Sequence, residues 1–184
     1  MNKVFLKPSR EKSLLKRHPW VYSGAIARVE GECVNGSTVM VCSSCGDFLA
    51  WASISQESQL ALRVWSFDKD CVINEDFFAG KLQTAWALRH ALDIPERTTA
   101  WRLCASEADG LPGVTIDVYN DYAVMLLTSA GADYHREALT QALMKQLLLC
   151  SGLGQVLICI LLGEGQGVCK QRRLYLLPCS GQCL

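Results

Sequence analysis

The chain has 184 residues, of which half are apolar and a fifth are charged. This composition is typical of a globular protein and excludes wholesale disorder, while collagen and long coiled coils are excluded because their repeats are missing. Lysine and arginine number 18, as do aspartate and glutamate, so the formal net charge is zero. Any affinity for nucleic acid must therefore come from a local patch.

The N-terminus does not have the pattern of a secretory signal, because Lys7 and Pro8 end its short apolar run. We therefore expect a cytoplasmic protein whose ten cysteines stay reduced. Cys42 and Cys45 form a lone C-x-x-C, with no second pair and no histidine at a suitable spacing. We expect no metal site.

Short strands separated by turns dominate the first 70 residues. Pro19 is expected to end a helix over residues 9–18, and Asn35-Gly36 is a strong turn signal. The expected strands cover residues 3–7, 20–22, 25–30, 37–42, 48–54 and 60–67. Strands at this spacing predict a small β-barrel.

Residues 74–149 have a different pattern. Apolar side chains at helical spacing predict helices over residues 74–92 and 133–149, and Asn74 is a suitable N-cap for the first. Alternating residues predict strands over 114–118 and 122–128, joined by a turn at Asn120-Asp121. The fold class is therefore α+β: a β-barrel over residues 1–70, followed by a small α-β-β-α domain over residues 74–149.

The tail, residues 151–184, has one acid and no tryptophan, phenylalanine or histidine. Periodicity is clear only over residues 156–162, so we expect a poorly structured tail. Polar residues interrupt the uncharged stretch 146–163, so we expect no membrane span. The glycine run 163–167 lacks the G-x-G-x-x-G spacing of a nucleotide-binding turn.

The strongest candidate site is a basic segment near the N-terminus. On the expected helix, Leu14 and Leu15 would anchor one side while cations cover the other. Cations neutralise phosphates, and aromatic rings stack on unpaired bases. The RNA-binding candidates, called the basic segment below, are Lys7, Arg10, Lys12, Lys16, Arg17, His18 and Trp20. The alternative, a solvated helix face with Trp20 in the core, stays open.

A second candidate is the polar stretch 106–113, which contains Glu107 and Asp109. Paired carboxylates can serve acid–base or metal chemistry, and a small enzyme that uses them is one alternative function. Turn chemistry explains the glycines and Pro112 of this stretch, so a structured loop is favoured. We assign no catalytic residue, since no convincing Ser-His-Asp or Cys-His arrangement is present.

Four stretches of the sequence together resemble one known family. They are residues 10–25 (REKSLLKRHPWVYSGA), 63–67 (RVWSF), 102–117 (RLCASEADGLPGVTID) and 129–131 (SAG). These residues are similar to the bacterial 23S ribosomal RNA cytosine-5 methyltransferases that carry an N-terminal PUA domain, and the resemblance covers about residues 1–149.

The resemblance implies a PUA-like RNA-binding domain at residues 1–70 and a linking α+β domain at 74–149. It also implies a Rossmann-like domain that binds S-adenosylmethionine, where a cysteine thiolate attacks C6 of cytosine so that C5 accepts the methyl group. No position of this chain matches that domain's cofactor glycines or nucleophile. Residues 151–184 do not resemble the family and look like an out-of-frame end.

We therefore expect the RNA-binding part of a 23S rRNA methyltransferase, with ribosomal RNA as its partner and no cofactor of its own. On this reading the chain is inactive alone. A homodimer is left open. The alternative function is a non-catalytic protein-interaction module without a role in RNA binding.

Overall fold

The computed structural model describes residues 2–120, 122–150, 157–163 and 169–176. The chain divides into two compact units. The N-terminal unit combines residues 1–74 with a short later segment, 129–135. The second unit contains residues 75–128 and 136–184. Within the described part of the chain, no helix has both the length and the hydropathy needed to span a bilayer.

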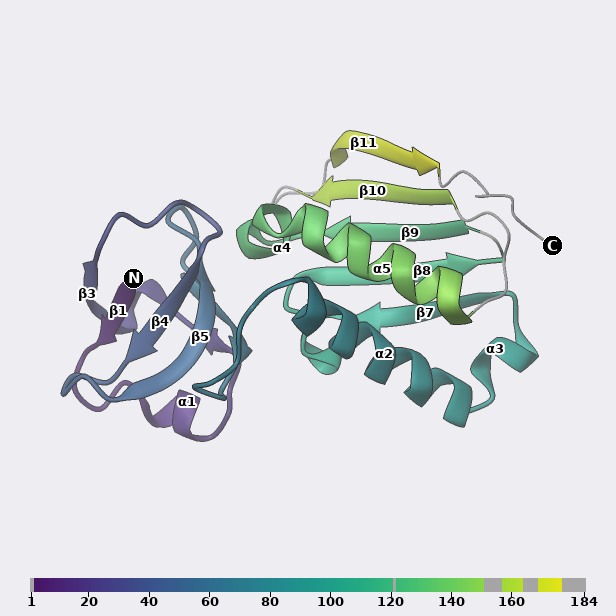
Figure 1. Ribbon diagram of the computed structural model, residues 1–184. Coiled ribbons are helices and arrows are strands. Elements are labelled where there is room, and N and C mark those ends of the chain that lie inside the picture. Colours follow the sequence, from purple (N-terminus) through teal and green to yellow (C-terminus); the bar gives the residue numbers. More distant parts are fainter. Residues whose placement is uncertain (1, 121, 151–156, 164–168, 177–184) are drawn as a thin grey trace. The chain divides into compact units, whose positions relative to one another are not determined.

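The N-terminal unit is built on a curled six-stranded sheet with the order β2-β6-β5-β4-β1-β3 (Figure 1). Only the pairing of β1 with β4 is parallel. This mixed, curled sheet confirms the predicted barrel-like architecture. Its strands are β1 (Lys3–Leu6), β2 (Trp20–Val21), β3 (Ile26–Glu30), β4 (Thr38–Cys42), β5 (Phe48–Ile54) and β6 (Leu62–Ser66).

Alternating apolar residues fill the inside of this sheet. Val39 and Val41 of β4 are fully buried, and so are Val4 and Leu6 of β1. Leu62 on β6 joins the same core, as its alternation in the sequence predicts. Side chains of successive strand residues point to opposite faces, so this burial fixes the register of each strand.

The first helix is much shorter than predicted. Helix α1 covers only Lys12–Leu15, whereas the sequence pattern predicts a helix over residues 9–18. The backbone enters the left-handed region at Ser9 (φ 64°) and at Arg17 (φ 59°), which limits the helix on both sides. The expected two-leucine anchor is also wrong, because Leu14 is buried but Leu15 is 67% exposed.

Helix α4 (Ala130–Tyr134) packs against the N-terminal unit although it follows the strands of the second unit in sequence. Two glycines permit the close approach. A Cβ atom on Gly131 would lie 2.2 Å from Cβ of Ser53, and one on Gly36 would lie 2.2 Å from the backbone oxygen of Ala130. Gly36 also has φ +85°, so the Asn35-Gly36 turn needs glycine for both conformation and space.

The second unit is a five-stranded sheet with the order β11-β10-β9-β8-β7. Helices α2 (Glu75–Ala91) and α5 (Arg136–Cys150) lie side by side on one face of it (Figure 1). The strands are β7 (Ala100–Ala105), β8 (Val114–Tyr119), β9 (Tyr122–Leu127), β10 (Leu157–Gly163) and β11 (Cys169–Leu176), and a short helix, α3 (Ile94–Arg97), precedes β7.

The predicted α-β-β-α order is confirmed in its two long helices and in the β8–β9 hairpin. Tyr119 pairs with Tyr122 at the hairpin end, and Asn120 has the positive φ, 48°, that tight hairpin turns favour. Strand β7 adds a third member, antiparallel to β8. In the tail, β10 falls on the one periodic run in the sequence and pairs in parallel with β9, while β11 has no sequence signal. The rest of the tail lies outside the described residues.

Candidate nucleic-acid interface

The basic segment lies on the surface of the N-terminal unit, between β1 and β2. All five of its cations are exposed, and none forms an ion pair within the described residues. Nζ of Lys7 donates a hydrogen bond to the backbone oxygen of Gly24 at 2.8 Å, which fixes this ammonium beside the turn before β3. The other cations extend into solvent, where a polyanion can reach them.

Helix α1 places two of the cations one turn apart. Lys12 begins the helix, and Lys16 caps its C-terminus, with the Lys16 amide bonded to the Lys12 carbonyl at 3.3 Å. Leu14 alone anchors this turn in the core. Arg17 follows, and its guanidinium carbon lies 5.5 Å from the ring centroid of Phe67. The short helix therefore still gathers Lys12, Lys16 and Arg17 within one stretch of surface.

The aromatic end of the segment forms a small cluster with β6. The His18 and Trp20 rings meet edge to face with centroids 5.7 Å apart, and Nδ1 of His18 accepts a hydrogen bond from the Trp20 amide at 3.2 Å. The sequence left open whether Trp20 stacks on bases or lies in the core. The side chain is half-buried, so part of the ring packs on the protein and part faces solvent. Its polar neighbour on the sheet is Arg63, whose guanidinium carbon lies 6.0 Å from the indole centroid.

Arg63 is the residue that the sequence-based candidate list lacks. It pairs directly with Trp20 across the β2–β6 ladder. The sequence signal that could have identified Arg63 is the alternation of apolar and polar residues. Arg63 stands between buried Leu62 and Val64, so its side chain must point outward. What the sequence does not contain is the pairing of β6 with β2, which brings Arg63 to the basic segment.

The loop at 106–113 has a structural role. Asp109 is nearly buried and receives both terminal nitrogens of Arg89, at 2.6 and 2.7 Å, together with the Ala105 amide at 2.6 Å. Burial alone would raise the pKa of Asp109, but these three donors outweigh it and lower the pKa. Ser106 ties the loop further, by donating to Glu107 and accepting from the Gly113 amide. A carboxylate held in this way is not available as a general acid or base at neutral pH.

The cysteines with a shifted pKa are poor nucleophiles. Burial raises the pKa of the Cys33 and Cys42 thiols, and burial together with the Asp109 charge raises that of Cys104 to about 12. The thiolate is the reactive form, so these three side chains are protonated at neutral pH. Among the described residues, no three histidine, cysteine or acidic side chains form a metal-binding group.

Comparison with known proteins agrees with this geometry. A family described as a PUA-like domain matches residues 4–67. The ribosomal RNA large subunit methyltransferase I of Erwinia tasmaniensis is 48% identical over 143 residues, which are 78% of this chain and 36% of that protein. The enzyme of the same name from Yersinia pseudotuberculosis is 42% identical over 183 residues, which are 97% of this chain and 46% of that protein.

These alignments have two consequences. The chain spans less than half the length of the curated relatives it matches. The Yersinia alignment also continues into the tail. The expectation that the resemblance ends near Leu149 is therefore wrong, because the resemblance extends beyond that residue. This agrees with the position of β10, which extends the sheet of the second unit beside β9.

Solved structures share the fold. A protein described as a SAM-dependent methyltransferase from Streptococcus mutans superposes with a TM-score of 0.70 over 87% of this chain and 41% of its own, at 21% identity. A second methyltransferase structure, complexed with SAH, has the same TM-score and identity. The chain therefore contains a PUA-like domain and is strongly homologous to part of the ribosomal RNA large subunit methyltransferases I.

Proposed function

We propose that this chain binds ribosomal RNA through the basic segment and Arg63, as the RNA-binding part of a SAM-dependent 23S rRNA cytosine-5 methyltransferase. The observation that carries the proposal is the set of exposed cations gathered beside the His18–Trp20–Arg63 cluster in a PUA-like domain. Cations hold the phosphates, while the aromatic edge and the guanidinium offer stacking surfaces to unpaired bases. The homology to rRNA methyltransferases supports ribosomal RNA as the ligand.

The lining of the pocket described below does not fit the methyl donor S-adenosylmethionine. This pocket in the N-terminal unit is lined by apolar side chains, hydroxyls, one thiol and one amide, with no carboxylate to hold ribose hydroxyls. The glycine run 163–167 lies almost entirely outside the described residues. We therefore expect this chain alone to transfer no methyl group from S-adenosylmethionine to rRNA.

The RNA interface is tested by measuring affinity across a salt series. A fluorescent single-stranded fragment of 23S rRNA is titrated with the wild-type chain and with the Lys12→Ala/Lys16→Ala/Arg17→Ala variant. Loss of three phosphate contacts on a single strand lowers the slope of log K against log salt by about two. The matched control, Lys69→Ala/Arg97→Ala/Lys145→Ala, removes the same charge elsewhere and should keep the wild-type slope.

An unchanged slope in the first variant would overturn the assignment of the interface. It would favour the alternative function, a protein-interaction module whose binding does not depend on the basic segment. We also propose that the chain can form a homodimer, and sedimentation of the same samples measures whether it does.

A further inference from the structure

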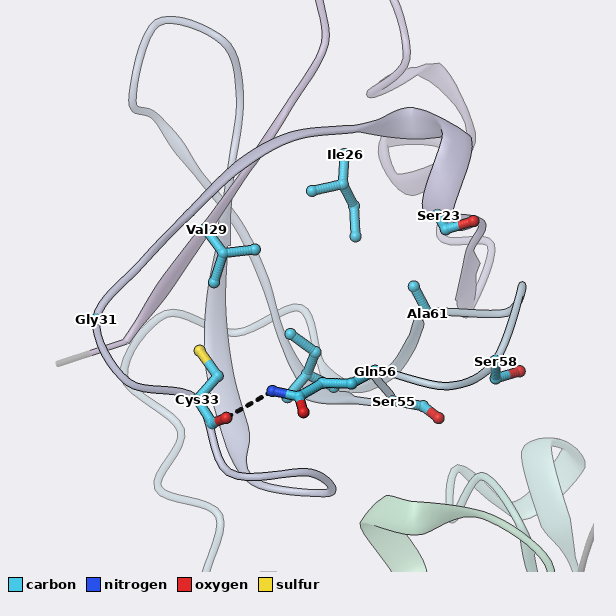
Figure 2. A pocket seen from close by; sticks show the side chains of 10 residues that line it. Ser23, Ile26, Val29, Gly31, Cys33, Ser55, Gln56, Ser58 and Ala61 are labelled. Carbon is cyan, nitrogen blue, oxygen red and sulfur yellow. Dashed lines mark hydrogen bonds between the residues drawn. The ribbon is translucent and has the colours of Figure 1, made fainter.

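A pocket of about 410 Å³ opens in the N-terminal unit, in the size range of ligand-binding cavities (Figure 2). It lies between β3 with its flanking residues on one side and the segment 54–61, which joins β5 to β6, on the other. Apolar side chains form much of its wall: Ile26, Val29, Ile54 and Ala61. None of the residues proposed for RNA binding lines it.

Hydrogen bonds hold the two sides of the pocket in place. The side-chain amide of Gln56 donates to the backbone oxygen of Cys33 at 2.7 Å, the dashed line in Figure 2, and the backbone amide of Gln56 donates to Oδ1 of Asn35 at 3.1 Å. The Ser23 amide donates to the Gln59 carbonyl at 2.8 Å. A pocket fixed in this way binds a ligand without the cost of ordering its walls.

Strand β3 is an edge strand. It stands last in the order of the six-stranded sheet, and among the described residues it pairs only with β1. Four of its five residues are exposed, and Val29 is 44% exposed although it is apolar. An edge strand has free backbone donors and acceptors, which an extended peptide can pair with.

The charge differs between the two ends of the pocket. Glu32 and Glu57 adjoin Cys33 and Gln56, which are hydrogen-bonded to each other, whereas Lys7 is bonded to the Gly24 oxygen beside Ser23. The lining segments 23–33 and 54–61 contain three acids, Glu30, Glu32 and Glu57, and one cation, Arg28. Arg28 is already engaged, since its Nε lies 3.0 Å from Glu30 and its guanidinium carbon 3.7 Å from the Phe5 ring centroid. Like charges repel, so the end with Glu32 and Glu57 disfavours a phosphate backbone and favours lysine or arginine side chains.

We propose that the pocket and β3 bind an extended, basic segment of a partner protein. The peptide backbone pairs with the free edge of β3, one apolar side chain enters the pocket, and lysine or arginine side chains lie beside Glu32 and Glu57. In a strand, alternate side chains point to opposite faces, so a sequence that alternates basic and apolar residues satisfies both requirements. This site is distinct from the RNA interface, because none of its lining residues belongs to the basic segment, although Lys7 of that segment is bonded to Gly24 beside it.

The probe is a fluorescein-labelled seven-residue peptide that alternates lysine with valine around a central leucine. We expect it to bind the full chain, and we expect two peptide changes to weaken binding at least about tenfold: glycine for the central leucine, and N-methylation of alternate backbone amides. Neither change touches the folding of the protein. The Glu32→Gln/Glu57→Gln variant should bind about fivefold more weakly, because it loses two surface ion pairs. The control Asp70→Asn/Glu137→Gln should bind as the wild type does.

Three results would overturn the proposal. The first is failure of the peptide to bind at about 1 mM, and the second is equal binding of the N-methylated peptide. The third is competition by a ten-residue uridine oligonucleotide that shifts the NMR signals of Val29, Cys33 and Ala61, which would make the pocket a nucleobase site. The triple alanine variant of the basic segment keeps the two hypotheses apart, because it should lose RNA affinity and retain the peptide.

Discussion

Two charged regions of the chain, the basic segment and the loop at 106–113, differ in how the fold uses their charged side chains. In the basic segment the cations stay in solvent and form no ion pair within the described residues. In the loop at 106–113 the carboxylate of Asp109 is enclosed by Arg89 and a backbone amide. The first region therefore has charge to offer a partner, while the charge of the second stabilises the fold.

This difference predicts that enclosed groups govern stability and exposed groups govern binding. The sharpest check is the Arg89→Met variant, which leaves Asp109 buried without its partner. The Arg89 and Asp109 side chains are only 12% and 7% exposed, so we expect the free energy of unfolding to fall by about 3 kcal/mol. Urea unfolding measures this loss, and RNA affinity of the folded variant should stay at the wild-type value.

A double variant separates the ion pair from the packing around it. Replacing both partners, in Arg89→Met/Asp109→Leu, removes the unpaired charge and should recover part of the lost stability. If the double variant is as unstable as the sum of the two single variants, the pair contributes no coupling and the comparison fails.

A smaller effect is expected where α4 meets the N-terminal unit. In the Gly131→Ala variant the added methyl group would meet Cβ and Oγ of Ser53 and the Trp65 ring, so packing must shift. Overpacking of this kind costs about 1–3 kcal/mol, which urea unfolding can detect. The matched control is Gly80→Ala, at a helix position with no atom within 4 Å, where alanine should be neutral or stabilising. Equal behaviour of the two variants would show that α4 is not held closely against Ser53.

The sequence predicts what depends on neighbours along the chain. Alternation gives β4 and β6 their buried faces, and the Asn120-Asp121 turn gives the β8–β9 hairpin, because these patterns are set within a few residues. Contacts between distant segments are not predictable in this way. Nothing local places residues 129–135 with the N-terminal unit, and Gly131 carries no sign that Ser53 lies above it.

The candidate site divides along the same line. The basic segment can be recognised in the sequence as a run of cations. Its helix is only four residues long, because Ser9 and Arg17 adopt left-handed conformations within the range predicted to be helical. Arg63 reaches Trp20 only through strand pairing, and Glu32 and Glu57, which adjoin lining residues of the pocket, come from two segments that are far apart in the sequence. The sequence shows the chemistry of each side chain, while strand pairing in the sheet determines which side chains are its neighbours in space.

The smallest expected effect concerns pH and the same α4 contact. His135 follows α4, its Nε2 lies 2.9 Å from Oγ1 of Thr38, and its ring meets Trp65 edge to face. Burial lowers the pKa of His135 below its ordinary value of 6.5, so protons bind the unfolded chain more readily than the folded one. Stability should therefore fall as pH drops below about 6.5, and it should be insensitive to His135 above that pH.

Melting temperatures between pH 7.5 and 5.5 measure this dependence in the wild type and in His135→Gln, whose amide can still bond Thr38. The variant should lose part of the acid sensitivity. An unchanged pH dependence would show that the partly buried imidazole of His135 does not couple folding to protons, and the division between enclosed and exposed groups would then fail beside α4.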